Sequence, residues 1–297
     1  MNLPDPRQIF GLDRRAVAQA FDRASGSYDA AAALQERVRN ELLVRLDELD
    51  IKPRSILDLG AGTGHGTRAL KRRYPKAAVV AVDIAPGMLA KARQQSRWLR
   101  RFGRVRADAY ALPFADGAFD VIFSSLMLQW CDDLDAVFAE IARVLKPGGL
   151  LLFSTFGPGT LAELREAWAT AGDTRNHVNH FFDPHALGAA LMQASLAEPV
   201  LDVDRIVARY PDAMSLMREL KAIGAHNVTQ GRARGLTGPR RLASMTKAYE
   251  TLRRDGGLPA TWEIIHVSAW GGERRMPENA GFPRETLISP SAIRRRK

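Results

Sequence analysis

Short apolar runs alternate with helical patterns along the first half of the chain. The clearest of them, Ala77–Asp83, is apolar up to its last residue, which is typical of a strand buried on both faces. The predicted strands are Ser55–Leu59, Ala77–Asp83, a short one around Val105, Phe119–Ser125, Leu150–Thr155, Val200–Tyr210 and Trp262–Trp270. Strands that alternate with helices in this rhythm predict an α/β fold with a doubly wound, mostly parallel sheet.

Apolar positions at helical spacing lie between and around these runs. They predict helices over 14–27, from Leu34 to Leu49, over 67–74, from Pro86, and over 133–146, 159–172, 183–194, 212–223 and 242–254. The chain then divides into an N-terminal helical lid segment (1–50), a strand-containing domain (51–270) and a tail (271–297). Residues 211–257 are predicted as a helical insertion between the last two strands, placed to shape an acceptor site. The tail has prolines and basic residues without periodicity, which predicts a flexible basic segment.

Composition narrows the class of protein. The 297 residues are 46% hydrophobic and 26% charged, which is ordinary for a globular protein with a large core. No apolar run reaches the roughly 18 residues of a membrane span, and the first residues lack a secretory apolar segment. Cys131 is the single cysteine, so an intramolecular disulfide and a cysteine-cluster metal site are excluded. We expect a cytoplasmic protein without a membrane contact or a bound metal.

The net charge of +10 is compatible with an anionic partner but does not require one. Nucleic acid, an anionic membrane and an acidic protein are all compatible with it, and so is an arginine-rich proteome with solvated basic faces. Part of the excess is local, because arginines crowd the segment 93–106 and end the chain at 294–297. No RNA-binding module is recognisable, so we expect no nucleic-acid partner.

A glycine-rich turn follows the first predicted strand. Gly60, Gly62 and Gly64 form a G-x-G-x-G pattern, with Asp58 two residues before it. Glycines between a strand and a helix let the backbone approach a ligand without side-chain obstruction. The dinucleotide-binding pattern would need glycine or alanine at position 65, where this chain has His65.

Polar residues occupy the carboxyl ends of the next strands. Asp83 lies 23 residues beyond Gly60, a spacing that suits hydrogen bonds to the hydroxyls of a ribose. The alternative is that Asp83 caps the helix that begins near Pro86. Asp108 and Ser125 also fall at strand ends, and in parallel sheets the ligand binds outside these ends. The pattern predicts a nucleoside site at this edge of the sheet.

Five motifs in order resemble those of class I S-adenosylmethionine (SAM) methyltransferases. They are Asp58–Gly64, Asp83–Leu89, Asp108–Phe114, Phe119–Ile122 and Arg143–Gly149, within about residues 50–155. The resemblance implies a Rossmann-like, seven-stranded sheet with an antiparallel last strand. It also implies SAM as cofactor, S-adenosylhomocysteine (SAH) as its product, and contacts to SAM from Asp58, Gly60, Gly62, Gly64, Asp83, Ile84, Met88, Asp108, Ala109, Ser125 and Gln129.

A narrower resemblance extends over almost the whole chain except its tail. Phe21–Asp29, Leu128–Cys131, His177–Phe181 and Leu220–Ala225 are similar to the malonyl-acyl-carrier-protein O-methyltransferases, the BioC family of biotin synthesis. The resemblance implies a transferase that methylates the free carboxylate of a malonyl thioester, with acyl carrier protein as the partner. The chain departs from the family at Ala61, where a cysteine is frequent, and in its additional tail.

A carboxylate acceptor is already ionised at neutral pH, so the reaction needs no general base. The family resemblance makes Tyr28 the catalytic candidate, with a packing tyrosine as the alternative. An arginine fork is the natural group to bind the acceptor carboxylate, and Arg23 and Arg232 are candidates, each also compatible with a surface role. His177 and Asn179 are predicted to line the acceptor pocket.

Three other functions stay open from the sequence. The chain is also compatible with a methyltransferase for another small carboxylate or a quinone precursor, and its charge with an RNA methyltransferase. The third alternative is a SAM-binding protein of respiratory-complex assembly that transfers no methyl group.

Overall fold

The seven strands form one sheet in the order β3-β2-β1-β4-β5-β7-β6. This computed structural model describes residues 11–96, 100–173, 177–225 and 238–272. The strands are β1 (Ser55–Leu59), β2 (Ala78–Asp83), β3 (Gly103–Arg106), β4 (Phe119–Ser125), β5 (Leu145–Phe156), β6 (Leu196–Tyr210) and β7 (Leu258–Gly271). Strands β1 to β5 are parallel, whereas β7 runs antiparallel to both β5 and β6. The expected fold and its antiparallel last strand are therefore confirmed.

Helices connect the strands at nearly the predicted positions. They are α2 (Arg14–Ala24), α3 (Tyr28–Ala31), α4 (Ala33–Asp47), α5 (His65–Arg73), α6 (Pro86–Gln95), the 3₁₀ turn η1 (Leu128–Trp130), α7 (Leu134–Val144), α8 (Ala162–Thr170), α9 (Pro184–Gln193), α10 (Ala213–Ala222) and α11 (Pro239–Glu250). The short helix α3 was not predicted. The last helix also begins earlier than predicted, because Pro239 can occupy the first helical turn, where its missing N–H is not needed.

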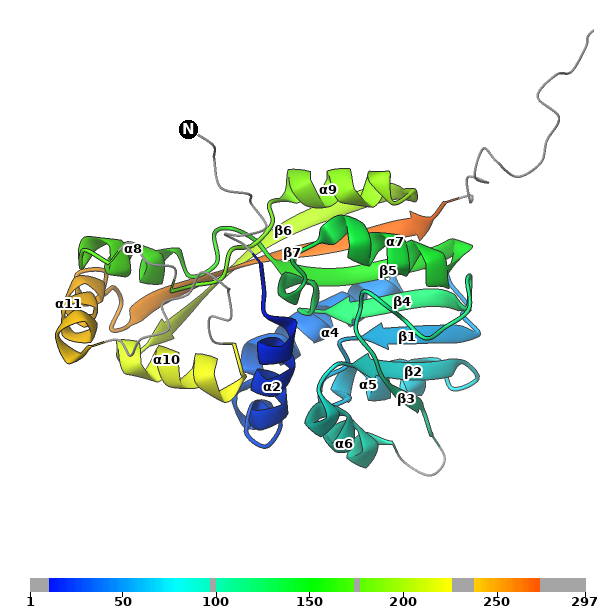
Figure 1. The fold of residues 1–297 in the computed structure, drawn as a ribbon, viewed down its shortest axis with the longest axis horizontal. Helices are drawn as coiled ribbons and strands as arrows, with labels where there is room; N and C mark the ends of the chain where they lie inside the picture. Colours follow the sequence, from blue (N-terminus) through cyan, green and yellow to red (C-terminus); the bar gives the residue numbers. More distant parts are fainter. Residues whose placement is uncertain (1–10, 97–99, 174–176, 226–237, 273–297) are drawn as a thin grey trace, which may run out of the picture.

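Apolar side chains of the parallel strands pack on both faces of the sheet. On one face, Leu57 and Ile122 contact a layer that includes Phe138 of α7 and Leu191 of α9. On the other face, strand residues such as Ile56 pack with side chains from α4 and α5. Figure 1 shows α7 and α9 on the near side of the upper sheet, with α4 and α5 behind the strands. The predicted double winding follows from this burial on two sides.

The long strands β6 and β7 extend beyond the parallel strands and carry a separate apolar cluster. Trp262 and Ile264 of β7 pack there with Trp168 of α8 and Tyr249 of α11. Figure 1 shows α8, α10 and α11 gathered at this end, next to the lid helix α2. The insertion between β6 and β7 contributes α10 and α11. Within the described residues, no helix has the length and apolar character needed to cross a membrane.

Candidate active site

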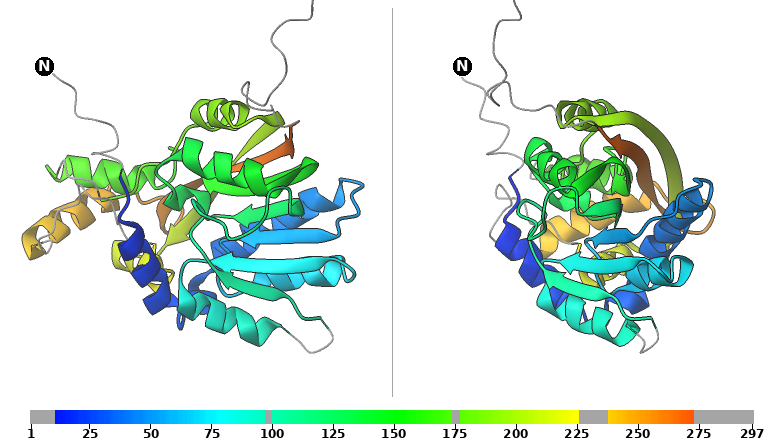
Figure 2. Two further views of the ribbon diagram at one scale, coloured as in Figure 1. Left: turned by 45° about the vertical axis from the view of Figure 1, so that its right-hand side comes forward. Right: turned by 90° about the vertical axis from the view of Figure 1, so that its right-hand side faces the viewer.

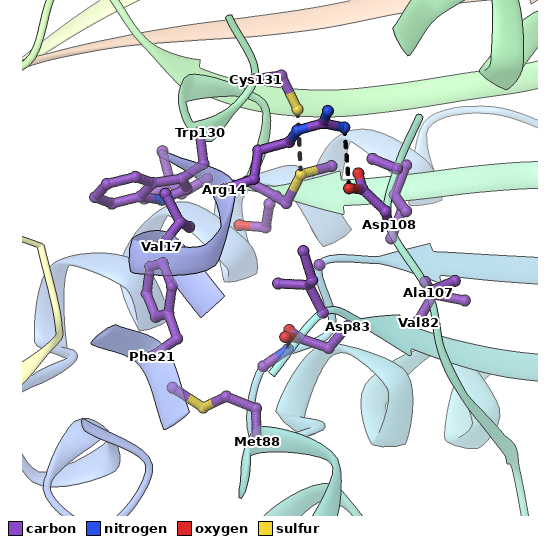
Figure 3. Close-up of a pocket in the computed structure, with 18 of the residues that line it drawn as sticks. Arg14, Val17, Phe21, Val82, Asp83, Met88, Ala107, Asp108, Trp130 and Cys131 are labelled. Atoms are coloured by element: carbon purple, nitrogen blue, oxygen red, sulfur yellow. Dashed lines mark hydrogen bonds and ion pairs between the residues drawn. The ribbon is translucent and has the colours of Figure 1, made fainter. Parts of the chain in front are cut away.

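The main cavity opens at the carboxyl ends of the parallel strands, beneath α2. Figure 3 shows Val17 and Phe21 of α2 with Trp130 on one side, and Asp83 and Met88 on the other. Eight residues that the sequence predicts as SAM contacts line this cavity, namely Gly60, Gly62, Asp83, Ile84, Met88, Asp108, Ala109 and Ser125. The structure therefore brings most of the predicted nucleoside site together at one edge of the sheet.

The glycine turn is shaped by backbone geometry that favours glycine. Gly60 has a φ of +76°, and a Cβ at this position would overlap the side chain of Met127. Gly62 has a φ of +54°, and a Cβ there would meet no atom within 4 Å, so its backbone lies open at the cavity. Gly64 is the N-cap of α5, and a Cβ there would come within 2.8 Å of the Ala92 Cβ. Glycine is needed at this position because α5 and α6 pack closely there, away from the cavity wall.

Asp83 links the glycine turn to the end of β2. One carboxylate oxygen accepts a hydrogen bond from Gly62 N at 2.8 Å, and the other accepts one from Ala85 N at 2.9 Å. Burial raises the pKa of this carboxyl group above its ordinary value. Residue Ala85 occupies the N-cap position of α6, so Asp83 is not the N-cap that the alternative interpretation proposed. Its oxygens keep further acceptor capacity toward the cavity.

A second, more polar cavity adjoins the first through Tyr28, Gly60, Gly62 and Ser125. We call it the polar extension, and its wall also includes Asp58, Arg39 and His65. Asp58 is 3% exposed and accepts a hydrogen bond from the Thr67 hydroxyl. Burial raises the pKa of Asp58 to about 7, against an opposing effect of the Thr67 hydrogen bond. A cationic group bound here would therefore meet a carboxyl group that is poised near neutral pH.

Tyr28 lies between the two cavities, at the start of α3. Burial raises the pKa of its phenol, with a further increase from Asp83, so the hydroxyl stays protonated at neutral pH. The next residue fixes this helix on the glycine turn. Asp29 accepts a hydrogen bond from the Thr63 hydroxyl at 2.6 Å and lies 3.3 Å from His65 Nε2.

The helix α2 closes the main cavity as a lid. Arg14 Nη1 lies 3.2 Å from Asp108 Oδ2, and the guanidinium sits 4.8 Å from the centre of the Tyr110 ring. Further along α2, Phe21 packs edge-on against Trp130, with ring centres 5.1 Å apart. Neither Arg14 nor Phe21 was predicted as a cavity residue. Arg39 of α4, in the polar extension, was not predicted either.

Two consecutive acidic residues before α7 have different roles. Asp133 is the N-cap, since its carboxylate accepts a hydrogen bond from Ala136 N at 3.0 Å. Asp132 instead accepts hydrogen bonds from Leu12 N at 3.0 Å and from the Tyr110 hydroxyl at 2.9 Å. The first member of the Asp-Asp pair therefore ties the lid segment to the cavity wall.

Two further cavities lie on the helical side of the lid. The inner one is lined by Gln129, His177 and Asn179 together with apolar residues of η1, α8 and β7. His177 stacks on Trp168 with ring centres 3.7 Å apart, and its Nε2 lies 3.2 Å from Asp173 Oδ2. The buried Gln129 donates to Leu126 O at 2.6 Å. Gln129 thus belongs to this inner cavity, and it does not line the main cavity.

The outer cavity is lined at one side by cationic residues. Arg23 of α2 lines it together with Arg218 and Lys221 of α10, and Trp168 and His177 form part of its apolar side. Arg23 therefore lies away from the main cavity, and its guanidinium is exposed. The other predicted arginine, Arg232, lies outside the described residues.

The chain is similar in sequence to known methyltransferases. A family profile described as "Methyltransferase domain" matches residues 57–153. The chain is 44% identical over 295 residues to the malonyl-[acyl-carrier protein] O-methyltransferase of Halorhodospira halophila, covering 99% of both chains. It is 48% identical over 271 residues to the protein of the same name from Methylovorus sp., covering 89% of this chain and 91% of the relative.

Solved structures share the fold at low sequence identity. The YcgJ protein of Bacillus subtilis superposes with a TM-score of 0.56 at 19% identity, covering 79% of this chain and 99% of that chain. Phosphoethanolamine N-methyltransferase 2 of Haemonchus contortus, solved with SAM, gives a TM-score of 0.55 at 18% identity, covering 85% of this chain and 57% of that chain. These likenesses support the architecture.

Proposed function

The chain belongs to the family of malonyl-[acyl-carrier protein] O-methyltransferases, and from this premise we infer that it is the SAM-dependent enzyme that esterifies malonyl-acyl carrier protein. The reaction converts the free carboxylate of the malonyl thioester to its methyl ester, an early step of biotin biosynthesis. The observation that carries the assignment of the donor site is the set of predicted SAM contacts around one cavity. The individual roles below are our proposals for this chain.

The main cavity and its polar extension suit the two ends of SAM. The open backbone at Gly62 leaves room that a side chain would fill, and Asp83 retains acceptor capacity for both ribose hydroxyls. Asp108 and Ala109 form the wall for the adenine, with Met88 as an apolar surface. Asp58 in the polar extension provides a carboxyl group for the amino-acid end.

The sulfonium of SAM supplies the methyl group, while the chain positions the acceptor and excludes water. A malonyl carboxylate needs no base because its pKa lies far below 7. The protonated Tyr28 hydroxyl, between the two cavities, donates a hydrogen bond that holds the carboxylate in line. The lid helix α2 covers the reacting atoms and excludes water from them. This exclusion strengthens the attraction between the malonyl carboxylate and the sulfonium of SAM.

The inner and outer cavities are proposed to admit the malonyl thioester from the helical side. Asn179 Oδ1 is buried without a hydrogen-bond partner among the described residues, so it is available to a polar group of the acceptor. Arg23, Arg218 and Lys221 at the outer cavity give its opening a positive charge. An acidic carrier protein would be steered to such a surface.

Mass spectrometry of malonyl-carrier protein after incubation with SAM tests the function. One added methyl group on the malonyl moiety is expected, with none on the unloaded carrier. Parallel reactions with free malonate and with a quinone precursor test the alternative acceptors. If the protein binds SAH but leaves malonyl-carrier protein unchanged, the methyltransferase assignment is wrong and the non-methylating alternative gains support.

The salt dependence of the rate tests the role of the cationic opening. Methylation of the carrier-bound substrate should slow with added salt more than methylation of a small malonyl thioester, because only the carrier presents many charges. Equal slowing of both substrates would remove the steering proposal while leaving the reaction itself intact.

A further inference from the structure

Three side chains of ligand type meet where α4 lies against the antiparallel end of the sheet. Glu41 belongs to α4, Asp204 to β6 and His266 to β7, and one potential ligand atom of each lies within 4.8 Å of the other two. His266 Nε2 is 3.6 Å from Asp204 Oδ2 and 3.8 Å from Glu41 Oε2. We call this group the α4 cluster. Its members are far apart in the sequence, so no spacing rule could reveal them.

Three buried atoms of the α4 cluster make no hydrogen bond within the described part of the chain. His266 is 2% exposed, and neither of its ring nitrogens makes a hydrogen bond there. Glu41 Oε2 is likewise buried without a hydrogen bond. Leaving one such group unsatisfied costs about 1–3 kcal/mol, and its presence in a folded protein calls for a bound water or ion. The unsatisfied Nε2 and Oε2 atoms face each other across one gap.

The surroundings of His266 favour its uncharged imidazole over the imidazolium. Burial and the nearby Arg45 lower its pKa, against the opposing effects of the surrounding carboxylates. The uncharged ring is the form that offers a lone pair to a metal ion.

The charged groups around the imidazole ring carry a net negative charge. Arg45 forms ion pairs with Asp202 and Asp204, and Arg37 binds the other oxygen of Glu41 at 2.8 Å. Three carboxylates and two guanidinium groups therefore leave one net negative charge beside the imidazole ring. Glu41 Oε2, which Arg37 leaves unbound, is the oxygen that approaches His266.

We propose that Glu41, Asp204 and His266 bind a divalent transition-metal ion such as Zn²⁺. One imidazole nitrogen and two carboxylate oxygens are a ligand set that these ions accept, with water completing the coordination. Metal–ligand bonds of about 2.0–2.2 Å place two ligand atoms of one ion at most about 4.4 Å apart. The distances from His266 already fall inside this limit. Both carboxylates are partly exposed, so small side-chain rotations complete the site.

The bound ion would fasten the N-terminal segment to the sheet. It would join α4 to β6 and β7, and Figure 2 shows α4 beside this end of the sheet. Two residues before Glu41, the same helix carries Arg39, which lines the polar extension. The metal is therefore assigned a structural role that holds one wall of the donor site, outside the reaction itself.

Calorimetric titration of the full-length, untagged protein with Zn²⁺ tests the proposal after removal of metals with a chelator. Wild type should bind one equivalent and gain thermal stability, since the ion binds only the folded chain. His266→Gln should weaken binding at least tenfold and abolish the stability gain. His185→Gln, which removes an exposed imidazole on α9, is the matched control and should behave as wild type.

A second probe separates lost binding from lost folding. Co²⁺ should give wild type the visible absorption of a site with a low coordination number, and Asp204→Asn should weaken that absorption. This variant should fold normally, because the Asp204 carboxylate is half-exposed and its replacement buries no new group. The absence of saturable Zn²⁺ binding by wild type overturns the proposal. So does binding that survives unchanged in both His266→Gln and Asp204→Asn.

Discussion

The parallel half of the sheet and the helical end of the molecule build the active site in different ways. In the parallel half, Asp83 ends β2, and Gly60 and Asp108 follow β1 and β3 within two residues, so local chain geometry and strand register bring them together. At the helical end, the inner and outer cavities are lined by residues of α2, α8 and α10 that meet only through packing. Site residues at strand ends can therefore be predicted from the sequence, whereas site residues that meet only through helix packing cannot.

The same contrast predicts how the two regions respond to mutation. Donor-side residues should affect SAM binding and fold stability, because they hold the glycine turn on the sheet. Acceptor-side residues should affect the carrier-bound substrate alone. The lid helix α2 borders both regions and should show a small effect on the donor side. The variants that follow test each part of this division.

The largest effect is expected from the pH dependence of stability at Asp58. Its folded pKa of about 7 lies above the ordinary value of 3.8, so the folded protein retains a proton that the unfolded chain loses. The stability of wild type relative to Asp58→Asn should be greatest below about pH 4, fall by on the order of 4 kcal/mol as pH rises to about 7, and then stay constant. Chemical denaturation at several pH values without SAM measures this difference.

A matched variant controls for the loss of a carboxylate in general. Asp135→Asn removes an exposed carboxylate in the first turn of α7 and should show no comparable fall over this pH range. If Asp58→Asn and wild type keep a constant difference from pH 4 to 7, the buried carboxyl group does not retain its proton as described.

Gly60→Ala should cause the next largest effect. The new Cβ would overlap Met127 on a backbone of positive φ, so the turn must shift. We expect about a 100-fold loss of kcat/KM for SAM and a loss of about 2–4 kcal/mol in unfolding free energy. Gly148→Ala introduces similar backbone strain at a φ of +70° with open space around the Cβ, and should cost about 1 kcal/mol with normal kcat/KM. Similar kinetics for both variants would contradict the special role of Gly60.

Asn179→Ala tests the acceptor side. Removing the buried amide should raise KM for malonyl-carrier protein about tenfold, the effect of one lost hydrogen bond to the substrate. The dissociation constant of SAH should stay within about twofold of wild type, because Asn179 lines the inner cavity alone. Steady-state kinetics and calorimetry measure the two constants. A weakened SAH affinity would show that the two regions are not separable at this residue.

Arg14→Ala should have the smallest effect. Its guanidinium is about half exposed, and such ion pairs contribute about 0–1 kcal/mol, so SAH should bind about threefold more weakly. Arg15→Ala removes an exposed arginine of the same helix turn and serves as the control for net charge. Equal affinities for the two variants would place the lid contact outside the binding of the donor.

Particular residues show how far the sequence could be interpreted. Asp83 and Asp108 could be predicted because each lies at the carboxyl end of a predicted strand that comes after the glycine turn. Arg14 and Arg39 could not, because an arginine that faces a cavity and one that faces water occupy the same polar positions of a helical pattern. Gln129 directly precedes Trp130, which lines the main cavity, yet Gln129 itself lines the inner cavity. Its amide donates a hydrogen bond to Leu126 O, which holds it there.

Glycine spacing has the same limit. Gly60 and Gly64 belong to one motif, yet Gly60 lines the main cavity, whereas Gly64 lies where α5 packs against α6. The motif predicts that small residues are needed at both places, and the contacts of the folded chain decide the reason for each. The fold could therefore be predicted more completely than the roles of single residues.

We propose that the carboxyl ends of the parallel strands form a donor site that is complete without the acceptor. Calorimetric titration of SAH, in the absence of malonyl-carrier protein, tests it most directly. Wild type and Asp183→Ala, which loses only the N-cap of α9, should bind one equivalent with equal affinity, whereas Asp83→Ala should bind at least about 30-fold more weakly. Equal SAH affinities for Asp83→Ala and wild type would show that Asp83 and the strand end that carries it do not hold the donor.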